Sequence, residues 1–495
     1  MCIHLVCNSK DLLFIVIEVS RKMSQVNDPT APVPPAPINT LPVEILKEIF
    51  ETYVASYPEV LDRRVVDLCL VGKHWNWVAN DTPKLWTDIY LTFPFAEHHL
   101  LAASKRVRAS KEEKIDIFID FRDPDPEWDG YEPEYDDIEA ADESIWVRNI
   151  MGMLKGTERR WKSVEVVSET WLPIYKLMDA WPYTHLPSLR SISVERANPI
   201  FGMRRVRFDP IELSRPITLF GRHASLPNLR NLSLSAVHVD WEDVSVSFRN
   251  LRMLELNNLT YDVGPSFEQF ATILSSSPRL EYLDVSGFCP EHSTAPEPPV
   301  GMDPDIPVVH LPVLKECIFG WKEVDHAPSF LEIFQIGSSL ENLTLLDTES
   351  GIMHRGGRPE RDRRWHHDST PIFQALDRLA SAAPEDENDI PPGPFISMRG
   401  VKNLWISWTK GSELIPVLEM MEELEDVVLE DIDEGVLSEV TLVASSRARA
   451  GRPLENLDIK WMWRPDIPRF AEDLILELQE TVINVSARGA EEFVD

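Results

Sequence analysis

The sequence contains few cysteines, and they form no pattern. The 495 residues include five, at positions 2, 7, 69, 289 and 317, with no C-x-x-C pair. An odd number of scattered cysteines argues against a disulfide framework and against a structural zinc site. This absence favours a reducing compartment, so we expect a cytoplasmic or nuclear protein, or one found in both.

The chain also lacks an apolar run long enough to cross a bilayer. The stretch "DLLFIVIEV" near the N-terminus contains Asp11 and Glu18 at its ends, and a membrane helix needs ~20 apolar residues. No small-residue cleavage site follows it. We expect residues 1–37 to be a disordered leader, and residues 1–22 either belong to it or are not part of the working protein. No membrane partner is expected.

Basic residues are scarce relative to acidic ones. The 49 Lys and Arg residues stand against 82 Asp and Glu, which gives a net charge of −33. Such a surface repels nucleic-acid phosphates and anionic lipids, so we expect no nucleic-acid partner and favour a basic or neutral protein surface. Solubility alone also explains much of the acidity.

Motifs of the common enzyme classes are missing. The chain has no G-x-x-x-x-G-K-[ST], G-x-G-x-x-G, G-x-S-x-G or H-E-x-x-H. His354, His366, His367 and Asp368 do cluster, but in an Arg-rich loop that would not preorganise metal ligands. We expect no enzyme, no cofactor and no metal. The "RGGRPERDRR" stretch is either a nuclear import patch or a solvated loop.

A small helical unit is predicted at residues 38–90. In "INTLPVEILKEIF" a proline stands where a first helical turn tolerates it, and the apolar residues after it recur at helical spacing. Two further apolar sets predict short helices at 65–71 and 75–79. Three short helices make a marginal core, and units this small usually depend on a partner.

Most of the remaining chain consists of a loose repeat. Each copy has the pattern apolar, two residues, apolar, one residue, apolar, and the copies begin at residues 161, 189, 229, 251, 280, 314, 340, 401, 424 and 454. Segments at 85 and 115 are further candidates. Helical patterns lie between them, for example around residues 267–274, 372–380 and 414–421. Strands that alternate with helices predict an α/β solenoid in which stacked units share one core.

This pattern resembles the leucine-rich repeat family over about residues 85–485. The asparagine expected three positions after the last strand leucine is replaced by Val237, Leu259 and Phe288, so we expect an irregular solenoid without a regular asparagine ladder. The predicted solenoid covers residues 91–485, with inserted loops at 121–143, 287–308 and 350–397, and a tail at 486–495. These loops either carry binding function or have no role.

The helical unit resembles an F-box, and the acidic chain with repeats is similar to F-box proteins of mushroom-forming fungi. The F-box pattern has Leu-Pro at the first helix, apolar pairs along it, a Leu-rich second helix, a V-x-K-x-W run and a closing Leu-Trp. The matching residues are Leu41, Pro42, Ile45, Leu46, Ile49, Phe50, Leu68, Leu70, Val71, Lys73, Trp75, Leu85 and Trp86.

The resemblance implies that the unit docks on the Skp-type adaptor of a cullin-RING ubiquitin ligase, while the repeats bind an unknown target protein. The expected adaptor contacts are Leu41, Pro42, Ile45, Leu46, Ile49 and Phe50. The expected core or cap residues are Leu68, Val71, Trp75, Leu85 and Trp86, with Trp77 assigned the same role. In the alternative, the protein is a non-ligase binding scaffold and the helical unit only caps the repeats.

Target-binding residues are sought among outward-facing strand positions. Trp405 and Trp408 are candidates because exposed tryptophans are common binding hot spots, although core packing explains either equally well. Arg230 and Arg252 are further candidates at the strands that begin near residues 229 and 251.

Overall fold

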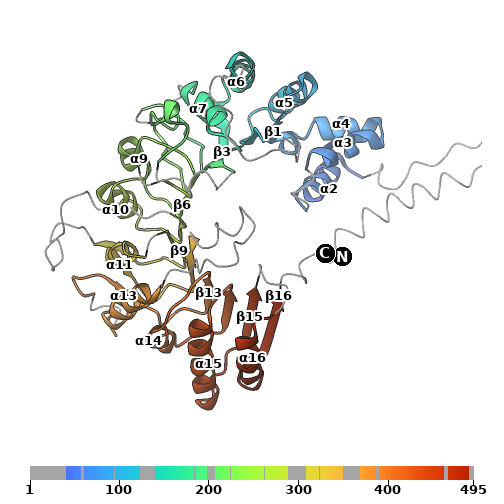
Figure 1. The fold of residues 1–495 in the computed structure, drawn as a ribbon. Helices are drawn as coiled ribbons and strands as arrows, with labels where there is room; N and C mark the ends of the chain where they lie inside the picture. The colour runs from blue at the N-terminus through green and yellow to red at the C-terminus, as the bar shows by residue number, and fades with distance from the viewer. Residues whose placement is uncertain are drawn as a thin grey trace, which may run out of the picture.

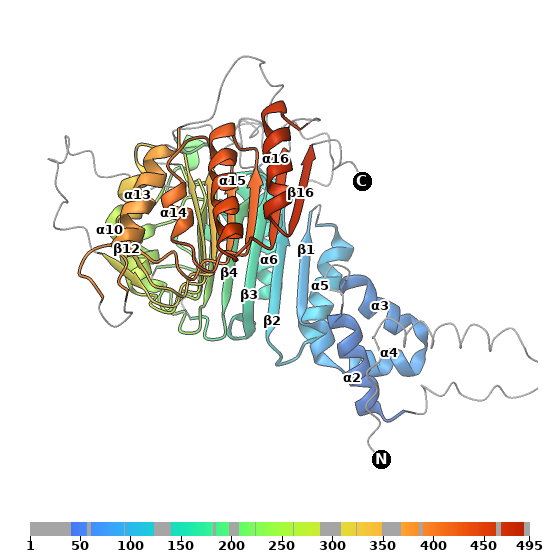
Figure 2. The ribbon, with the colours of Figure 1, turned by 90° about the horizontal axis from the view of Figure 1, so that it is seen from below.

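The chain folds into a curved α/β array with a small helical unit at its N-terminal end (Figures 1 and 2). The computed structural model describes residues 41–56, 61–93, 95–122, 140–181, 185–197, 207–222, 224–260, 262–287, 308–322, 324–348, 368–385, 390–461 and 467–489.

The helical unit consists of α2 (Val43–Ala55), α3 (Leu61–Val71), α4 (Lys73–Asn80) and the 3₁₀ turn η3 (Pro83–Trp86). The helices of the array are α5 (Glu97–Ala109), α6 (Ala140–Leu154), η4 (Glu158–Arg160), α7 (Trp171–Asp179), η5 (Ile211–Leu213), α9 (Trp241–Ser247), α10 (Phe267–Ser275), α11 (Ala327–Leu331), α13 (Thr370–Ser381), α14 (Ile415–Glu419), α15 (Glu434–Arg449) and α16 (Arg469–Thr481).

One large sheet runs through the whole array. Its strands are β1 (Asp88–Thr92), β2 (Ile115–Asp120), β3 (Trp161–Ser168), β4 (Ser191–Arg196), β5 (Asn231–Ser235), β6 (Met253–Asn257), β7 (Tyr282–Val285), β9 (Glu316–Trp321), β11 (Asn342–Asp347), β13 (Asn403–Ser407), β14 (Asp426–Glu430), β15 (Asn456–Trp461) and β16 (Asn484–Gly489). These thirteen strands are parallel neighbours in chain order. All ten predicted repeat segments form strands of this sheet, and the segments at 85 and 115 contribute β1 and β2.

The sheet forms the inner layer of the curve, and the helices form its outer layer (Figure 1). Alternate strand residues are buried, as in the pattern of β5, where Leu232 and Leu234 are inaccessible and the residues between them are half-buried. The buried residues pack under the helices, while the others form the inner face of the sheet. The helices predicted around 267–274, 372–380 and 414–421 are confirmed as α10, α13 and α14.

A second, smaller sheet was not predicted. It contains β8 (Val309–Leu311), β10 (Phe334–Ile336) and β12 (Phe395–Ile396), all parallel. The large core also contains fully buried tryptophans. The ring centroids of two of them, Trp161 and Trp181, lie 5.3 Å apart. Large aromatic side chains fill the wider gaps that irregular repeats leave between strand and helix layers.

Four of the predicted boundaries differ from the structure. The segment 350–397, expected to be an inserted loop, contains α13 and β12, because its apolar residues at helical spacing bury against the core. Helix α6 begins inside the predicted loop 121–143, and β16, at residues 484–489, crosses the predicted boundary between the solenoid and the tail at residue 486. Strand β1 crosses the predicted boundary at residue 90. Residues 1–37 and 288–307 lie outside the described residues.

Within the described part of the chain, no helix combines the length and the apolar character needed to cross a bilayer.

Candidate functional site

The N-terminal helical unit has a small core of its own. Leu46 and Phe50 of α2 are completely buried there, and the Phe50 ring lies 4.9 Å from the Trp75 ring of α4. Leu68, Leu85 and Trp86 complete this core, as predicted. The prediction that Leu46 and Phe50 contact an adaptor is therefore wrong for this conformation, because neither side chain reaches the surface.

The adjacent face of α2 remains exposed. Pro42 is exposed, and Ile45 has 42% of its surface accessible. Leu41 and Ile49 are half-buried at the margin of the same core. Positions 42, 45 and 49 follow one another at helical spacing, so they form one apolar stripe beside the buried one. Helix α2 thus carries more apolar surface than its own unit covers.

Helices α3 and α4 add further exposed apolar side chains. Leu70 is 76% exposed, and Val66, Val71 and Trp77 are each about half exposed or more. Val71 and Trp77 were predicted to be core or cap residues, and this prediction is wrong: the buried side of α3 is formed by Val65 and Leu68, and the buried side of α4 by Trp75, Val78 and Ala79. The Trp77 ring instead stacks on His74.

These exposed residues are concentrated in one part of the molecule. Sixteen large apolar residues are exposed in the described chain, and five of them belong to the helical unit: Ile45, Val66, Leu70, Val71 and Trp77. The unit makes up only about a tenth of the sequence. Large apolar patches on a surface usually mark a site of protein or membrane contact.

The array touches the helical unit at a different place. Trp86 donates from its indole nitrogen to the Ala79 carbonyl at 2.8 Å, and Lys105 and Arg106 of α5 lie over its ring, at 5.3 and 5.7 Å from the centroid. Ala109 of α5 packs on the same core. The junction therefore uses the Trp86 side of the unit, while Pro42, Ile45 and Leu70 stay exposed.

Ion pairs fix α2 on its other flank. Lys47 donates to Asp81 at 2.9 Å, and Lys84 donates to Glu51 at 3.3 Å. The hydrogen bond and the charge of Lys47 lower the pKa of Asp81. Because these pairs hold α2 against the end of α4 and against η3, the orientation of the exposed stripe is fixed by the unit itself.

The inner face of the sheet is acidic over its N-terminal half. Burial and the neighbouring Asp116 carboxylate raise the pKa of Asp88, and burial together with Glu195 raises that of Glu165. In the middle of the sheet, burial raises the pKa of Asp284 to about 6. Carboxylates that repel one another in this way favour a basic protein surface as an occupant.

In the C-terminal half of the inner face, apolar residues lie around Trp405. Trp405 is 42% exposed, and the register places Ile318 and Thr344 on one side of it and Val428 on the other. The ammonium of Lys460 lies 5.8 Å from the centroid of the Trp405 ring. This tryptophan therefore stays a candidate contact for a target protein.

Trp408 does not share that position. Its side chain is only 8% exposed, and its backbone takes φ of 61° in the turn that follows β13. The left-handed residue ends the alternation of the strand, so the side chain packs into the protein. The prediction that Trp408 binds a target is wrong for this conformation.

Asparagine pairs occur at a different position from the one considered in the sequence. Asparagines open β11, β13, β15 and β16, while Asp426 opens β14 between the two pairs and accepts from the Asn456 amide at 2.5 Å. The Asn403 amide donates to Asn342 at 2.6 Å, and the Asn484 amide donates to Asn456 at 3.0 Å. These bonds tie neighbouring strands together where the strands begin.

Arg230 and Arg252 lie at the edge of the sheet rather than in the middle of its inner face. Each immediately precedes the first residue of its strand, β5 and β6. The Arg252 amide donates to the Arg230 carbonyl at 2.7 Å, and the Arg252 guanidinium pairs with Glu281 at 3.2 Å. Both side chains are accessible, Arg230 partly and Arg252 largely.

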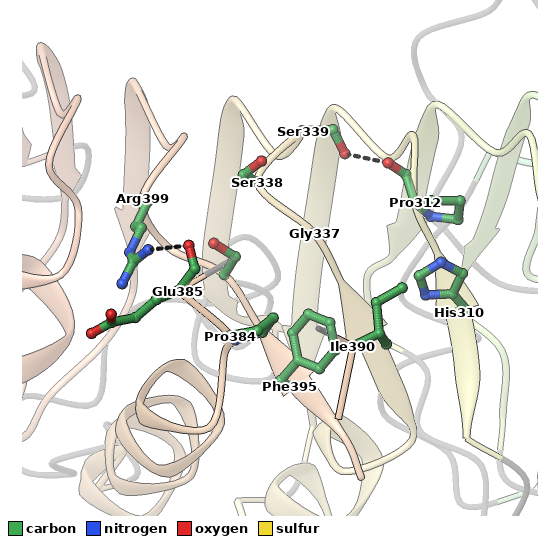
Figure 3. Close-up of a pocket in the computed structure, with 11 residues that line it drawn as sticks. His310, Pro312, Gly337, Ser338, Ser339, Pro384, Glu385, Ile390, Phe395 and Arg399 are labelled. Atoms are coloured by element: carbon green, nitrogen blue, oxygen red, sulfur yellow. Dashed lines mark hydrogen bonds between the residues drawn. The ribbon is translucent and has the colours of Figure 1, made fainter. Parts of the chain in front are cut away.

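A pocket of about 370 Å³ lies beside the small sheet, in the turns that lead into β11 and β13 (Figure 3). His310 and Arg399 stand at opposite ends of it. The Ser339 hydroxyl donates to the Pro312 carbonyl at 3.0 Å, and Arg399 donates to the Glu385 carbonyl at 3.3 Å. Because these polar groups bond to the pocket's own walls, they do not converge on a common point.

Several predicted features fall outside the described residues. These are the core of the acidic segment, the Pro-rich segment and the histidines at 354, 366 and 367. Within the described ranges, no three His, Cys, Asp or Glu side chains lie close enough to hold a metal ion.

No protein-family model matches the chain, and comparison with curated proteins gave no match either.

Proposed function

We propose that the protein is a substrate-recognition subunit of a Skp-cullin-F-box ubiquitin ligase. In this proposal the helical unit is an F-box that docks on the Skp-type adaptor, and the repeat array presents its inner face to a target protein. The protein itself then carries out no chemistry, because ubiquitin transfer belongs to other subunits. The site of action is the cytoplasm or the nucleus.

One observation carries the proposal: the unit exposes apolar residues that its own array leaves uncovered. Exposed apolar surface costs ~25 cal/mol per Å², and a partner that covers it recovers that free energy. The stripe at Pro42, Ile45 and Ile49 and the exposed side chains of Leu70 and Trp77 provide the centre of such an interface. A standard interface buries about 1,600 Å² in total.

The correction at Leu46 and Phe50 sharpens this proposal. Both residues belong to the resemblance, but they hold α2 in place rather than touching a partner. The contact surface then consists of Pro42 and Ile45 on α2, together with residues of α3 and α4. Because the ion pairs of Lys47 and Glu51 lie on another flank, docking does not require the unit to rearrange.

A second candidate function is a binding scaffold in which the unit only caps the array. The junction at Trp86, with two cations over its ring and Ala109 packed beside it, favours a capping role. Capping alone, however, gives no reason for Leu70 and Ile45 to remain apolar and exposed.

Co-purification with a recombinant Skp-type adaptor separates the two functions. We expect the wild-type chain to bind, and Ile45→Asp with Leu70→Asp to abolish binding. Ile45→Asp lies in the first turn of α2, where the helix dipole favours an acidic residue, whereas Leu70→Asp lies in the last turn of α3, where the dipole disfavours it by about 0.3–1 kcal/mol. Both side chains are exposed, so the fold is expected to survive, as circular dichroism can verify.

The matched control replaces two exposed leucines of the array in the same way. Leu442→Asp with Leu476→Asp changes α15 and α16, whose leucines are equally accessible. This variant is expected to bind the adaptor as the wild type does. If the wild-type chain never co-purifies with the adaptor, the ligase proposal fails and the capped scaffold is left.

A further inference from the structure

Along one edge of the sheet, basic residues occur on four consecutive strands. We define the strand-start edge as the row of residues that immediately precedes or opens each strand. Its backbone is continuous: Arg190 donates its amide to the Lys162 carbonyl at 2.7 Å, Arg230 to Arg190 at 2.8 Å, and Arg252 to Arg230 at 2.7 Å. Lys162, Arg190, Arg230 and Arg252 therefore occupy equivalent positions on β3 to β6.

The same row has a different charge pattern in the C-terminal half. There the ladder continues through Glu281, Lys315, Glu341, Lys402, Glu425 and Glu455, so opposite charges alternate as far as Glu425 and two glutamates follow each other at the end. Arg252 and Lys315 both pair with Glu281, at 3.2 and 3.8 Å. Alternation of this kind stabilises a sheet, whereas like charges on adjacent strands destabilise it. The four cations on β3 to β6 are the longest run of like charge in this row of the described residues, and sheet stability alone does not account for it.

The two cations at the ends of the run are neutralised, and the two in the middle are not. Lys162 donates to Asp116 at 2.8 Å, and Arg252 pairs with Glu281. Within the described residues, no carboxylate bonds to Arg190 or Arg230. Arg230 donates only to the adjacent Leu229 carbonyl, at 2.6 Å.

Uncharged donors lie next to the two arginines. The inner face continues from them with Ser191 and Ser193 on β4 and with Asn231 and Ser233 on β5, in register. All four are partly accessible. Two guanidinium groups beside hydroxyl and amide donors form a favourable environment for a carboxylate or a phosphate.

The carboxylates on the inner face nearest to Arg190 and Arg230 lie farther along the strands than the two arginines. Glu165 lies opposite Ser193, and Glu255 lies opposite Ser233, three residues beyond the arginines, or about 10 Å. Glu195 lies farther still. An anion is therefore favoured at the strand-start edge and repelled deeper on the inner face, which limits the occupant to a narrow strip.

We propose that the strand-start edge of β3 to β6 binds a short acidic segment of a partner protein, with its carboxylates or phosphates held between Arg190 and Arg230 and with Lys162 and Arg252 flanking them. Four strands span about 14 Å, which is the length of roughly five extended residues. A long polyanion such as a nucleic acid would run into the acidic remainder of a chain with net charge −33.

This inference deepens the proposed function by stating what the repeat array takes as a target. It is tested without an adaptor, so either proposal can fail while the other stands. The helical unit joins β1 at the same edge, since the Asp116 amide donates to the Thr87 carbonyl at 3.0 Å. A segment bound there would lie on the edge of the array from which the docking unit extends.

The test is the fluorescence anisotropy of three labelled peptides with the purified full chain at low ionic strength. One peptide contains a run of glutamates, one replaces two of them with phosphoserine, and one replaces all of them with glutamine. Binding of either acidic peptide above the glutamine peptide supports the proposal, and the stronger of the two identifies carboxylate or phosphate as the source.

A matched pair of variants locates the binding. Arg190→Gln with Arg230→Gln is expected to weaken acidic-peptide binding at least about tenfold. Lys315→Gln with Lys402→Gln removes the same charge from the same row, in its alternating part, and is expected to change binding less than about twofold. Equal losses in the two variants, or no preference over the glutamine peptide, would overturn the proposal. Tighter, arginine-dependent binding of a single-stranded oligonucleotide of equal charge would also overturn it.

Discussion

At the scale of single residues, Asp284 is a carboxylate of the inner face whose charged form is destabilised by burial. Its carboxylate is almost fully buried and accepts hydrogen bonds from the Asn257 amide at 3.3 Å and from the Ser286 amide at 3.0 Å. Burial nevertheless dominates and raises its pKa from 3.8 to about 6, with Glu255 adding to the effect. The folded state therefore binds this proton more tightly than the unfolded state does.

This shift predicts a pH dependence with a definite sign. Because the folded-state pKa is the higher one, the contribution of Asp284 to stability is greatest below about pH 4 and is lost as pH rises through about 6. In the wild type, ionisation of Asp284 should lower the free energy of unfolding by roughly 1–3 kcal/mol as pH rises from about 4 to above about 6. In Asp284→Asn this decrease should be absent. Urea unfolding at several pH values measures it, and an unchanged pH slope in the variant would contradict it.

Asp458 provides a control of opposite sign. Burial raises its pKa, but hydrogen bonds from Lys460 and Ser486 and the charges of Lys460 and Arg488 outweigh this, so the net shift is downward. The contribution of Asp458 to stability should be present at neutral pH and lost on acidification. In the wild type Asp458 therefore raises the free energy of unfolding as pH rises, whereas Asp284 lowers it, and Asp458→Asn should lack this rise.

The burial or exposure of single residues could be predicted from the sequence where one hydrophobic periodicity determined it. The apolar stripe of α2 was found from its spacing, but the division between buried Phe50 and exposed Ile45 depends on where α3 and α4 pack, which spacing does not specify. Trp405 follows the strand alternation and is exposed. Trp408 itself takes the left-handed conformation that ends the alternation, and no local signal in the sequence marks that change.

At the scale of elements, the start of helix α10 follows directly from its sequence. The Ser266 hydroxyl accepts from the Gln269 amide at 3.3 Å, and the Gln269 side chain accepts from the Ser266 amide at 2.9 Å, which forms a capping box at α10. Most other helices of the array have no side-chain cap in the described residues, so packing must hold their ends.

The capping box predicts a measurable loss. Ser266→Ala should reduce the free energy of unfolding by about 1 kcal/mol, because the α10 amides lose their acceptor. Ser276→Ala at the other end of α10 is the control, since there the backbone amide makes the cap bonds, and it should cost less than about 0.5 kcal/mol. Equal losses in chemical denaturation would show that the box contributes nothing.

Elements with a strong repeated pattern were predictable, and short or irregular ones were not. The ten repeat segments all form strands because each buries at least two apolar residues in the shared core. Strands β8, β10 and β12 contain three, three and two residues, too few to show a period. Residues 486–489 of β16 fell in the predicted tail, and "NVSARG" alternates only weakly between apolar and polar residues, so it gives little sign of a strand.

At the scale of the whole molecule, the exposed apolar face of the helical unit and the inner face of the sheet are separate surfaces. The helical unit attaches through Trp86 and leaves its apolar stripe exposed, while the array turns its strands inward and its helices outward (Figures 1 and 2). The function that we propose, linking a ligase to a target, needs two such surfaces that do not compete. The curved sheet, continuous from β1 to β16, provides a rigid connection between them.

Hydrogen exchange on the purified chain, with and without a recombinant Skp-type adaptor, tests the central claim most directly. We predict that the adaptor slows amide exchange in α2 and α3, because covering Ile45 and Leu70 suppresses local opening of these helices, while exchange in β3 to β6 stays unchanged. Unchanged exchange in α2 and α3 at adaptor concentrations that saturate binding, or slowing confined to the array, would contradict the claim.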